Sequence, residues 1–238
     1  MSNLLPQNFP AVAPAGLVSY TFNDFIQGNS YMALYGAVYT SGSSAIPPVS
    51  TKKYFLTTNQ VYSHDIIVSG TTLNPGTAAG GYISNNDFDI TFNIPQSIKG
   101  YAYLNITIGA SKNGGGNANE IFISGASIQN VTAGTTLATA TGESLLIPDN
   151  ASVSKTNLLQ FDLTGQTYHF KRGDVLRLNI PFGCVTNGTN GLQYAGYGAD
   201  PKDRDDPNLN LGSWQTTLSG ATTSQLVLYI PVVTDLGD

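Results

Sequence analysis

The sequence predicts an all-β fold, and within that class a jelly-roll-like β-sandwich of two antiparallel sheets with an extended N-terminal arm. Three observations predict it. Apolar and polar residues alternate with a period of two in many segments, no segment has the i, i+3, i+4, i+7 apolar spacing of a helix, and Gly, Asn, Pro or Ser clusters separate the segments. At 238 residues, we expect a single domain over 17–238 after an arm at 1–16.

The arm is the first element in chain order. Residues 1–16 contain three Pro and two Asn and have no periodic pattern, which is typical of an extended segment. We expect its apolar residues to contact a partner protein. They are Leu4, Leu5, Phe9 and Val12.

The strands follow from the arm onward. In DFDITFNI, four apolar residues face one way while the polar residues between them face the other, as in a strand with one solvated face. The apolar residues are Phe88, Ile90, Phe92 and Ile94. The predicted strands are 17–25, 31–40, 53–58, 61–68, 87–94, 103–109, 120–129, 135–140, 143–148, 157–163, 174–182 and 225–232. Long connections at 69–86, 110–119 and 185–222 favour a two-sheet jelly roll over a simple meander.

One turn carries a known adhesive tripeptide. Arg172-Gly173-Asp174 stands before the alternating Leu176, Leu178 and Ile180, so it lies at a strand entrance. Gly and Asp are favoured turn residues whatever the ligand, and a turn is therefore the preferred interpretation. An integrin-binding adhesion protein is the less favoured alternative.

The connection 185–222 holds two candidate sites. Tyr194, Tyr197 and Trp214 would stack on sugar rings in a carbohydrate-binding module, or would cover the core edge or fill a subunit contact. Asp200, Asp203, Asp205 and Asp206 are clustered carboxylates that suit Ca²⁺, although Lys202 and Arg204 between them favour a solvated, salt-bridged loop. No other cofactor is expected.

Composition excludes several classes of protein. Only 11% of residues are charged, less than half of the roughly 25% that is usual. A net charge of −5 with 10 scattered basic residues predicts no nucleic-acid binding. Neither a signal peptide nor a stretch of 18 apolar residues is visible, so we expect a protein made in the cytoplasm without a membrane partner.

Catalytic motifs are not evident. The two histidines, His64 and His169, are too few for a three-histidine zinc site, and no motif joins them to a nucleophile. Cys184 lies in the apolar context IPFGCV and is expected to be a core residue. The sequence therefore predicts that the chain is not an enzyme.

Four stretches carry a resemblance: VSYTFNDFIQGNSYMALYGA (18–37), YFLTTNQVYSHDI (54–66), FDITFNIPQSIKGYAYLNI (88–106) and FKRGDVLRL (170–178). Together they resemble the structural proteins of tailed viruses, especially jelly-roll proteins that decorate or cement the capsid. The resemblance implies a virion protein that binds the major capsid shell and associates with itself, with a trimer as the expected state. A tail or fibre module that binds a receptor or carbohydrate is the alternative.

Overall fold

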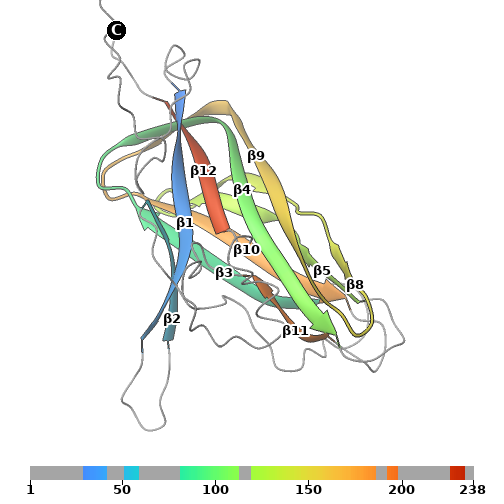
Figure 1. The fold of residues 1–238 in the computed structure, drawn as a ribbon. Helices are drawn as coiled ribbons and strands as arrows, with labels where there is room; N and C mark the ends of the chain where they lie inside the picture. The colour runs from blue at the N-terminus through green and yellow to red at the C-terminus, as the bar shows by residue number, and fades with distance from the viewer. Residues whose placement is uncertain are drawn as a thin grey trace, which may run out of the picture.

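The computed structural model describes residues 29–41, 51–58, 81–112, 119–185, 192–197 and 226–233. All regular structure in these residues is β-strand, which confirms the predicted all-β class (Figure 1). The strands are β1 Asn29–Ser41, β2 Thr51–Thr57, β3 Gly81–Thr91, β4 Gln96–Lys112, β5 Asn119–Ile123, β6 Ala126–Asn130, β7 Thr135–Ala140, β8 Leu145–Ile147, β9 Ser152–Phe170, β10 Val175–Val185, β11 Leu192–Tyr197 and β12 Leu226–Val233. Within the described ranges, no helix could span a membrane.

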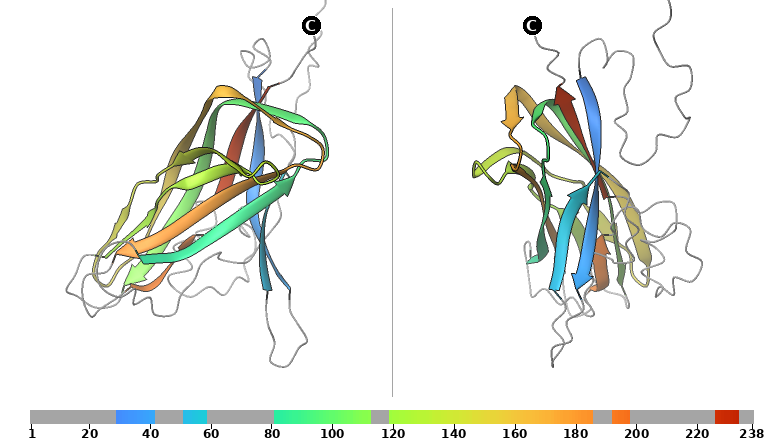
Figure 2. Two further views of the ribbon diagram at one scale, coloured as in Figure 1. Left: turned by 180° about the vertical axis from the view of Figure 1, so that it is seen from behind. Right: turned by 90° about the vertical axis from the view of Figure 1, so that its left-hand side faces the viewer.

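The twelve strands belong to one continuous sheet that curls into a nearly closed barrel (Figure 2). Its main path is β11-β4-β12-β1-β2-β3-β10-β5-β8, while β9 pairs with β4, and β6 pairs with both β10 and β7. A single parallel bridge, Phe55 to Asp89, joins β2 to β3. In the described residues, the strands therefore do not divide into the two separate sheets that the sequence predicted.

Strands β4 and β9 form the longest pair. They run antiparallel from Gln96 opposite Phe170 to Ser111 opposite Ser152, with an irregularity between Ile98 and Gly100. The other edge of β4 pairs with β12 along one part of its length and with β11 along another. The alternating residues of β4 that face the barrel interior, Ala102, Leu104, Ile106 and Ile108, are fully buried.

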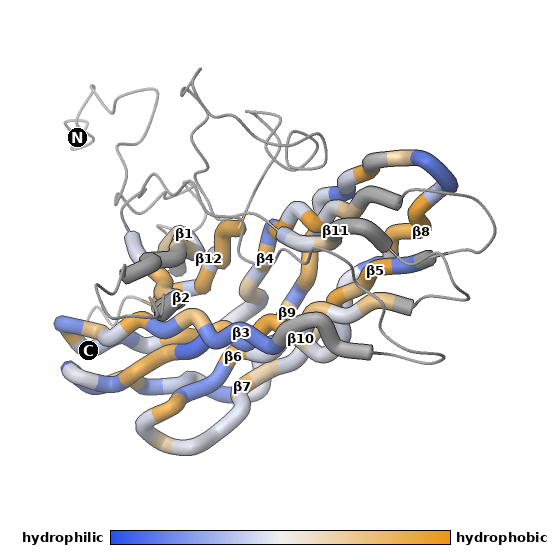
Figure 3. Tube along the Cα trace, turned by 90° about the horizontal axis from the view of Figure 1, so that it is seen from below, coloured by the Kyte–Doolittle hydropathy of each residue, from blue (hydrophilic) through white to orange (hydrophobic). Residues whose placement is uncertain are grey.

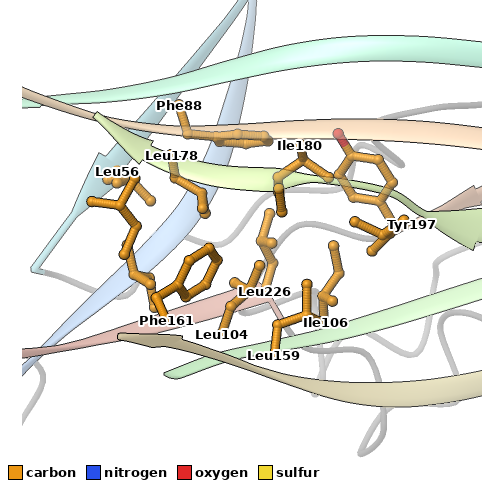
Figure 4. Close-up of a cluster of buried hydrophobic side chains, with 14 of the residues drawn as sticks. Leu56, Phe88, Leu104, Ile106, Leu159, Phe161, Leu178, Ile180, Tyr197 and Leu226 are labelled. Atoms are coloured by element: carbon orange, nitrogen blue, oxygen red, sulfur yellow. The ribbon is translucent and has the colours of Figure 1, made fainter. Parts of the chain in front are cut away.

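The core fills the barrel between opposite walls. Phe88 and Leu178, from β3 and β10, point toward Leu104 and Phe161, from β4 and β9 (Figure 4). All four side chains are fully buried, and each such side chain stabilises the fold by about 1.5–3 kcal/mol. Figure 3 shows hydrophobic and hydrophilic residues following one another along β3, as the period of two requires.

Side chains rather than a backbone ladder close the barrel between β9 and the segment that runs from β7 to β8. Tyr168 Oη donates to the Leu137 carbonyl oxygen at 3.4 Å, and Asn157 Nδ2 donates to the Glu143 carbonyl oxygen at 2.9 Å. Lys155 adds an ion pair with the Glu143 carboxylate. Since no backbone pairing between β9 and β7 or β8 occurs in the described residues, this line of contact is the seam of the barrel.

Several predicted elements differ from the structure. The predicted strand 120–129 is two strands, because Gly125 adopts a φ of 69° between β5 and β6. Strand β11 lies inside the predicted connection 185–222. The predicted strand 87–94 ends at Thr91, so Ile94, which was expected to face the core, lies in the following turn and is 65% exposed. The arm 1–16 and the predicted strands 17–25 and 61–68 lie outside the described residues.

Candidate functional site: two binding surfaces

The Arg-Gly-Asp tripeptide forms a tight turn between β9 and β10. Asp174 N donates to the Lys171 carbonyl oxygen at 3.0 Å, and Gly173 has a φ of 91°, which glycine adopts without strain. The Asp174 carboxylate accepts a hydrogen bond from Lys171 N at 2.7 Å. One oxygen of the carboxylate that an integrin would bind is thus engaged within the turn itself.

Two neighbouring turns are fastened to this one. Phe92 N donates to the Asp174 carbonyl oxygen at 2.9 Å, and Gly173 N donates to the Phe92 carbonyl oxygen at 2.8 Å. Val131 N donates to the Val175 carbonyl oxygen at 2.9 Å. Residues 92–95, 131–134 and 171–174 therefore form one hydrogen-bonded unit at one end of the barrel, which we name the turn platform.

The turn platform exposes aliphatic and cationic side chains together. Ile94 is 65% exposed and Val131 is 38% exposed, and both Lys171 and Arg172 are exposed. The residue of opposite charge in these turns is Asp174, whose carboxylate is turned to Lys171 N. This combination can contact an apolar surface that also carries negative charge.

A second surface lies on the outer face of β1, β12, β4 and β9. Leu104 and Leu228 point into the core, so the residues beside them in sequence point outward. The outward residues are rich in tyrosine, and we name them the tyrosine face. Its residues are Tyr31, Tyr101, Tyr103, Tyr229 and Leu158.

Strand pairing brings these side chains together. Tyr103 stands opposite Tyr229 on one neighbouring strand and opposite Gln160 on the other. The rings of Tyr31 and Tyr103 lie 6.1 Å apart at an angle of 44°. Leu158 is 66% exposed and Tyr101 is 41% exposed, while the other three tyrosines are partly exposed. The face thus offers aromatic and aliphatic contact area on rigid strands.

Few charges accompany the tyrosine face. Asp162 stands opposite Tyr101, and the hydroxyl and backbone N–H of Thr164 both donate to its carboxylate. These hydrogen bonds lower the pKa of Asp162, so it stays ionised at neutral pH. A surface of tyrosines with little charge is typical of the central part of protein interfaces.

The outer face of β3 and β10 carries a polar cluster instead. Arg177 forms a two-pronged pair with Asp89, at 2.7 and 2.8 Å, and its third nitrogen lies 2.7 Å from Asp87. Asn179 Nδ2 donates to Asp87 at 2.6 Å and to Asn85 at 2.7 Å. The hydrogen bond to Asp89, the largest cause, raises the pKa of Arg177. These groups satisfy one another and hold β3 to β10.

The structure describes two of the predicted site residues, Tyr194 and Tyr197. Tyr197 is fully buried, its hydroxyl accepts a hydrogen bond from Asn86 Nδ2 at 2.8 Å, and its ring packs edge-on against Phe182. It is therefore not available as a glycan or subunit contact. Tyr194 lies in β11. The remaining site residues lie outside the described residues: the arm residues Leu4, Leu5, Phe9 and Val12, then Trp214, and the four aspartates Asp200, Asp203, Asp205 and Asp206.

Sequence reasoning missed the tyrosine face, although a signal for it was present. In the stretch YAYLNI, tyrosines 101 and 103 alternate with Ala102 and Leu104, so one face of this strand is aromatic. What the sequence does not show is that β12 and β1 bring Tyr229 and Tyr31 to the same face. Strand order, rather than spacing along the chain, assembles this surface.

Two groups of catalytic type are visible. Ser97 Oγ and His169 Nδ1 lie 2.9 Å apart on adjacent exposed positions of β4 and β9, and no carboxylate in the described part of the chain bonds to this histidine. Cys184 is buried, and burial raises the pKa of its thiol to about 11. Among the described residues, no group of three or more His, Cys, Asp or Glu could hold a metal ion.

No protein-family model matches the chain, and no curated protein matches it either. Two crystal structures of a CocE/NonD family hydrolase from Staphylococcus aureus are similar to it, with TM-scores of 0.40 and 0.38 and 12% sequence identity in both cases. The matches cover 87% and 86% of this chain, but only 37% of each hydrolase chain.

This finding corrects the prediction that the chain is not an enzyme. Both structures named above are of a hydrolase, so the prediction is withdrawn. The likeness transfers no catalytic residue and no substrate, because the identity is 12% and the chain spans 37% of the hydrolase's length.

Proposed function

We propose that this chain is a structural protein of a virus particle, which binds the major shell protein and associates with copies of itself. The observation that carries the proposal is the tyrosine face. It combines aromatic rings and the exposed Leu158 on four adjacent strands, and among the described residues one carboxylate, Asp162, stands opposite a tyrosine of this face. Tyrosine is enriched and charged residues are depleted at protein interfaces. An aromatic side chain buries a large area and has few rotatable bonds, so it loses little conformational entropy on binding.

The low overall charge supports the same function. With 11% charged residues, little free energy is needed to desolvate this surface when another protein covers it. A rigid sheet also loses little conformational freedom on binding. Repeated weak contacts of this kind gain strength from the lattice of a particle, where many copies bind at once.

The arm and the two-sheet arrangement belong to this proposal as well. Among the described residues, the single bridge from Phe55 to Asp89 on one side and the unpaired seam at β9 on the other are all that join two walls, and these walls would correspond to the two sheets of a jelly roll. Residues 1–16, with Leu4, Leu5, Phe9 and Val12, would extend from the domain to a neighbour in the particle.

Measuring self-association tests directly whether the tyrosine face is the interface between copies of the chain. We expect Tyr101→Ser combined with Leu158→Ser to weaken self-association by at least about tenfold, because both side chains are exposed and their loss removes interface area rather than core. The measurement is sedimentation velocity across a range of protein concentrations. Thr139→Ser, at an exposed position of β7, is the control and should leave the wild-type distribution unchanged. Equal association of all three proteins would rule out the tyrosine face as the interface.

A carbohydrate-binding module is the second candidate. The same face favours it, because Gln160 and Asp162 place hydrogen-bonding groups beside Tyr103 and Tyr101, and sugars bind through rings flanked by such groups. A glycan array separates the two functions. Binding of a saccharide that Tyr101→Ser abolishes would favour the sugar-binding function, whereas an array without signal would favour the particle protein.

A further inference from the structure

We infer that the turn platform is a second binding surface, which docks on an acidic, partly apolar surface of a protein partner. The inference rests on the proposed function for the identity of that partner, the shell protein. The platform lies at one end of the barrel, away from the short strands β5 and β8 at the other end (Figure 1).

The platform is positive within a chain that is negative. Its turns contain Lys171 and Arg172 and one acidic residue, Asp174, which gives 2 − 1 = +1, while the whole chain carries −5. Lys99, an exposed cation near the start of β4, follows the turn 92–95 in the chain. An acidic partner surface would therefore be attracted to this end of the barrel. Lys52 and Lys53 in β2 form another cation pair, which serves as the control below.

The platform is held in one shape before any partner binds. Besides the bonds that link the three turns, Val175 N donates to Thr132 Oγ1 at 3.0 Å, and Ala133 N donates to Asn130 Oδ1 at 2.9 Å. Gly134 N closes its turn on the Val131 carbonyl oxygen at 3.2 Å. Binding to such a surface does not require loop ordering, which would otherwise reduce the affinity.

The ligand chemistry follows from the mixture of side chains. Arg172 and Lys171 suit carboxylates, and Ile94 and Val131 suit aliphatic or aromatic side chains. Protein surfaces offer both kinds of group. A nucleic-acid backbone offers phosphates but no aliphatic partner for Ile94, so a protein surface is the better match.

The test uses purified capsids and the full chain. We expect the double variant Lys171→Glu, Arg172→Glu to pellet with capsids at least about tenfold more weakly than the wild type, because two attractive charges become repulsive. The matched control is Lys52→Glu, Lys53→Glu, which changes the net charge by the same amount in β2. A turn variant that pellets like the wild type would overturn the inference and leave the proposed function standing.

The apolar part has its own matched pair. Ile94→Ser removes a side chain that is 65% exposed on the platform, and Leu146→Ser removes one that is 60% exposed on β8. We expect only Ile94→Ser to weaken capsid binding, by roughly threefold to tenfold for the lost contact area. Equal effects of the two variants would show that Ile94 is not part of the docking surface.

A third experiment tests the preference for acidic surfaces without capsids. Immobilised poly-L-glutamate should retain the wild type and the Lys52/Lys53 control at low salt, and retain the Lys171/Arg172 variant much less. Retention should fall as salt rises, since exposed charges are screened. No retention of the wild type, or tighter binding to a single-stranded oligonucleotide than to poly-L-glutamate, would contradict an acidic protein surface as the ligand.

Discussion

At the scale of single residues, charged side chains in this chain hold strands and turns together. Arg177 joins β10 to Asp87 and Asp89 of β3, and Asp174 closes the turn that precedes β10. With so few charged residues in the chain, an exposed cation on a turn, such as Arg172, stands out as a candidate for binding. The sequence shows that Arg172 is present, but not that hydrogen bonds hold its turn in one conformation.

Cys184 provides a prediction at this scale. Burial raises the pKa of its thiol from 9.0 to about 11, so at pH 8 about a hundredfold less thiolate is present than for an unperturbed cysteine. We expect labelling by a thiol reagent to be at least that much slower in the native protein than in denaturant. Rapid native labelling would show that Cys184 is accessible and that the wall around β10 opens readily.

At the scale of elements, a glycine fixes how closely β1 and β12 pack. A Cβ at Gly36 would lie 2.5 Å from Leu226 Cγ and closer still to its Cδ2, so a larger residue would displace a core side chain. We expect Gly36→Ala to lower the free energy of unfolding by about 1–3 kcal/mol, measured by urea denaturation. Gly165→Ala is the control, because no atom lies within 4 Å of the added Cβ. Equal stability of the two variants would contradict this packing.

The seam of the barrel gives a pH-dependent prediction. A hydrogen bond from Lys155, followed by the charge of the same residue, lowers the pKa of Glu143 below its ordinary value of 4.5. A carboxylate with a lowered pKa in the folded state adds stability above its unfolded pKa and loses it as the pH falls through its folded pKa. The ion pair therefore supports the seam at neutral pH and not in acid.

Thermal unfolding of the wild type and Glu143→Gln as a function of pH tests this. We expect a small difference in Tm at pH 7, since the pair is exposed and such pairs contribute little. The difference should vanish when the pH is well below 4.5. A difference that persists in acid would mean that packing, and not the ion pair, accounts for the effect.

At the scale of the whole molecule, the period of two predicted most strands but not their arrangement. Strand β7 occupies the predicted range 135–140, and β4 extends the predicted 103–109 to Gln96–Lys112. The long connections suggested two sheets, whereas the bridge from Phe55 to Asp89 makes one sheet of the described strands. A contact between residues that are 34 positions apart leaves no local mark in the sequence.

For the candidate sites too, local features could be predicted from the sequence, and features that depend on strand order could not. The turn at Arg172-Gly173-Asp174 was predicted, because Gly and Asp determine turns locally. Tyr197 was expected to bind sugar, to cover the core edge or to fill a subunit contact. Strand β11 pairs with β4 and buries its ring in the core. The tyrosine face was missed because it depends on the neighbours of β12.

The most direct test of a structural role in a virus particle is co-sedimentation of the purified chain with intact capsids, after light scattering has established its mass. We predict a defined oligomer that pellets with capsids in a saturable way and is absent from the pellet without them. A chain that stays in the supernatant at every capsid concentration would contradict the particle role.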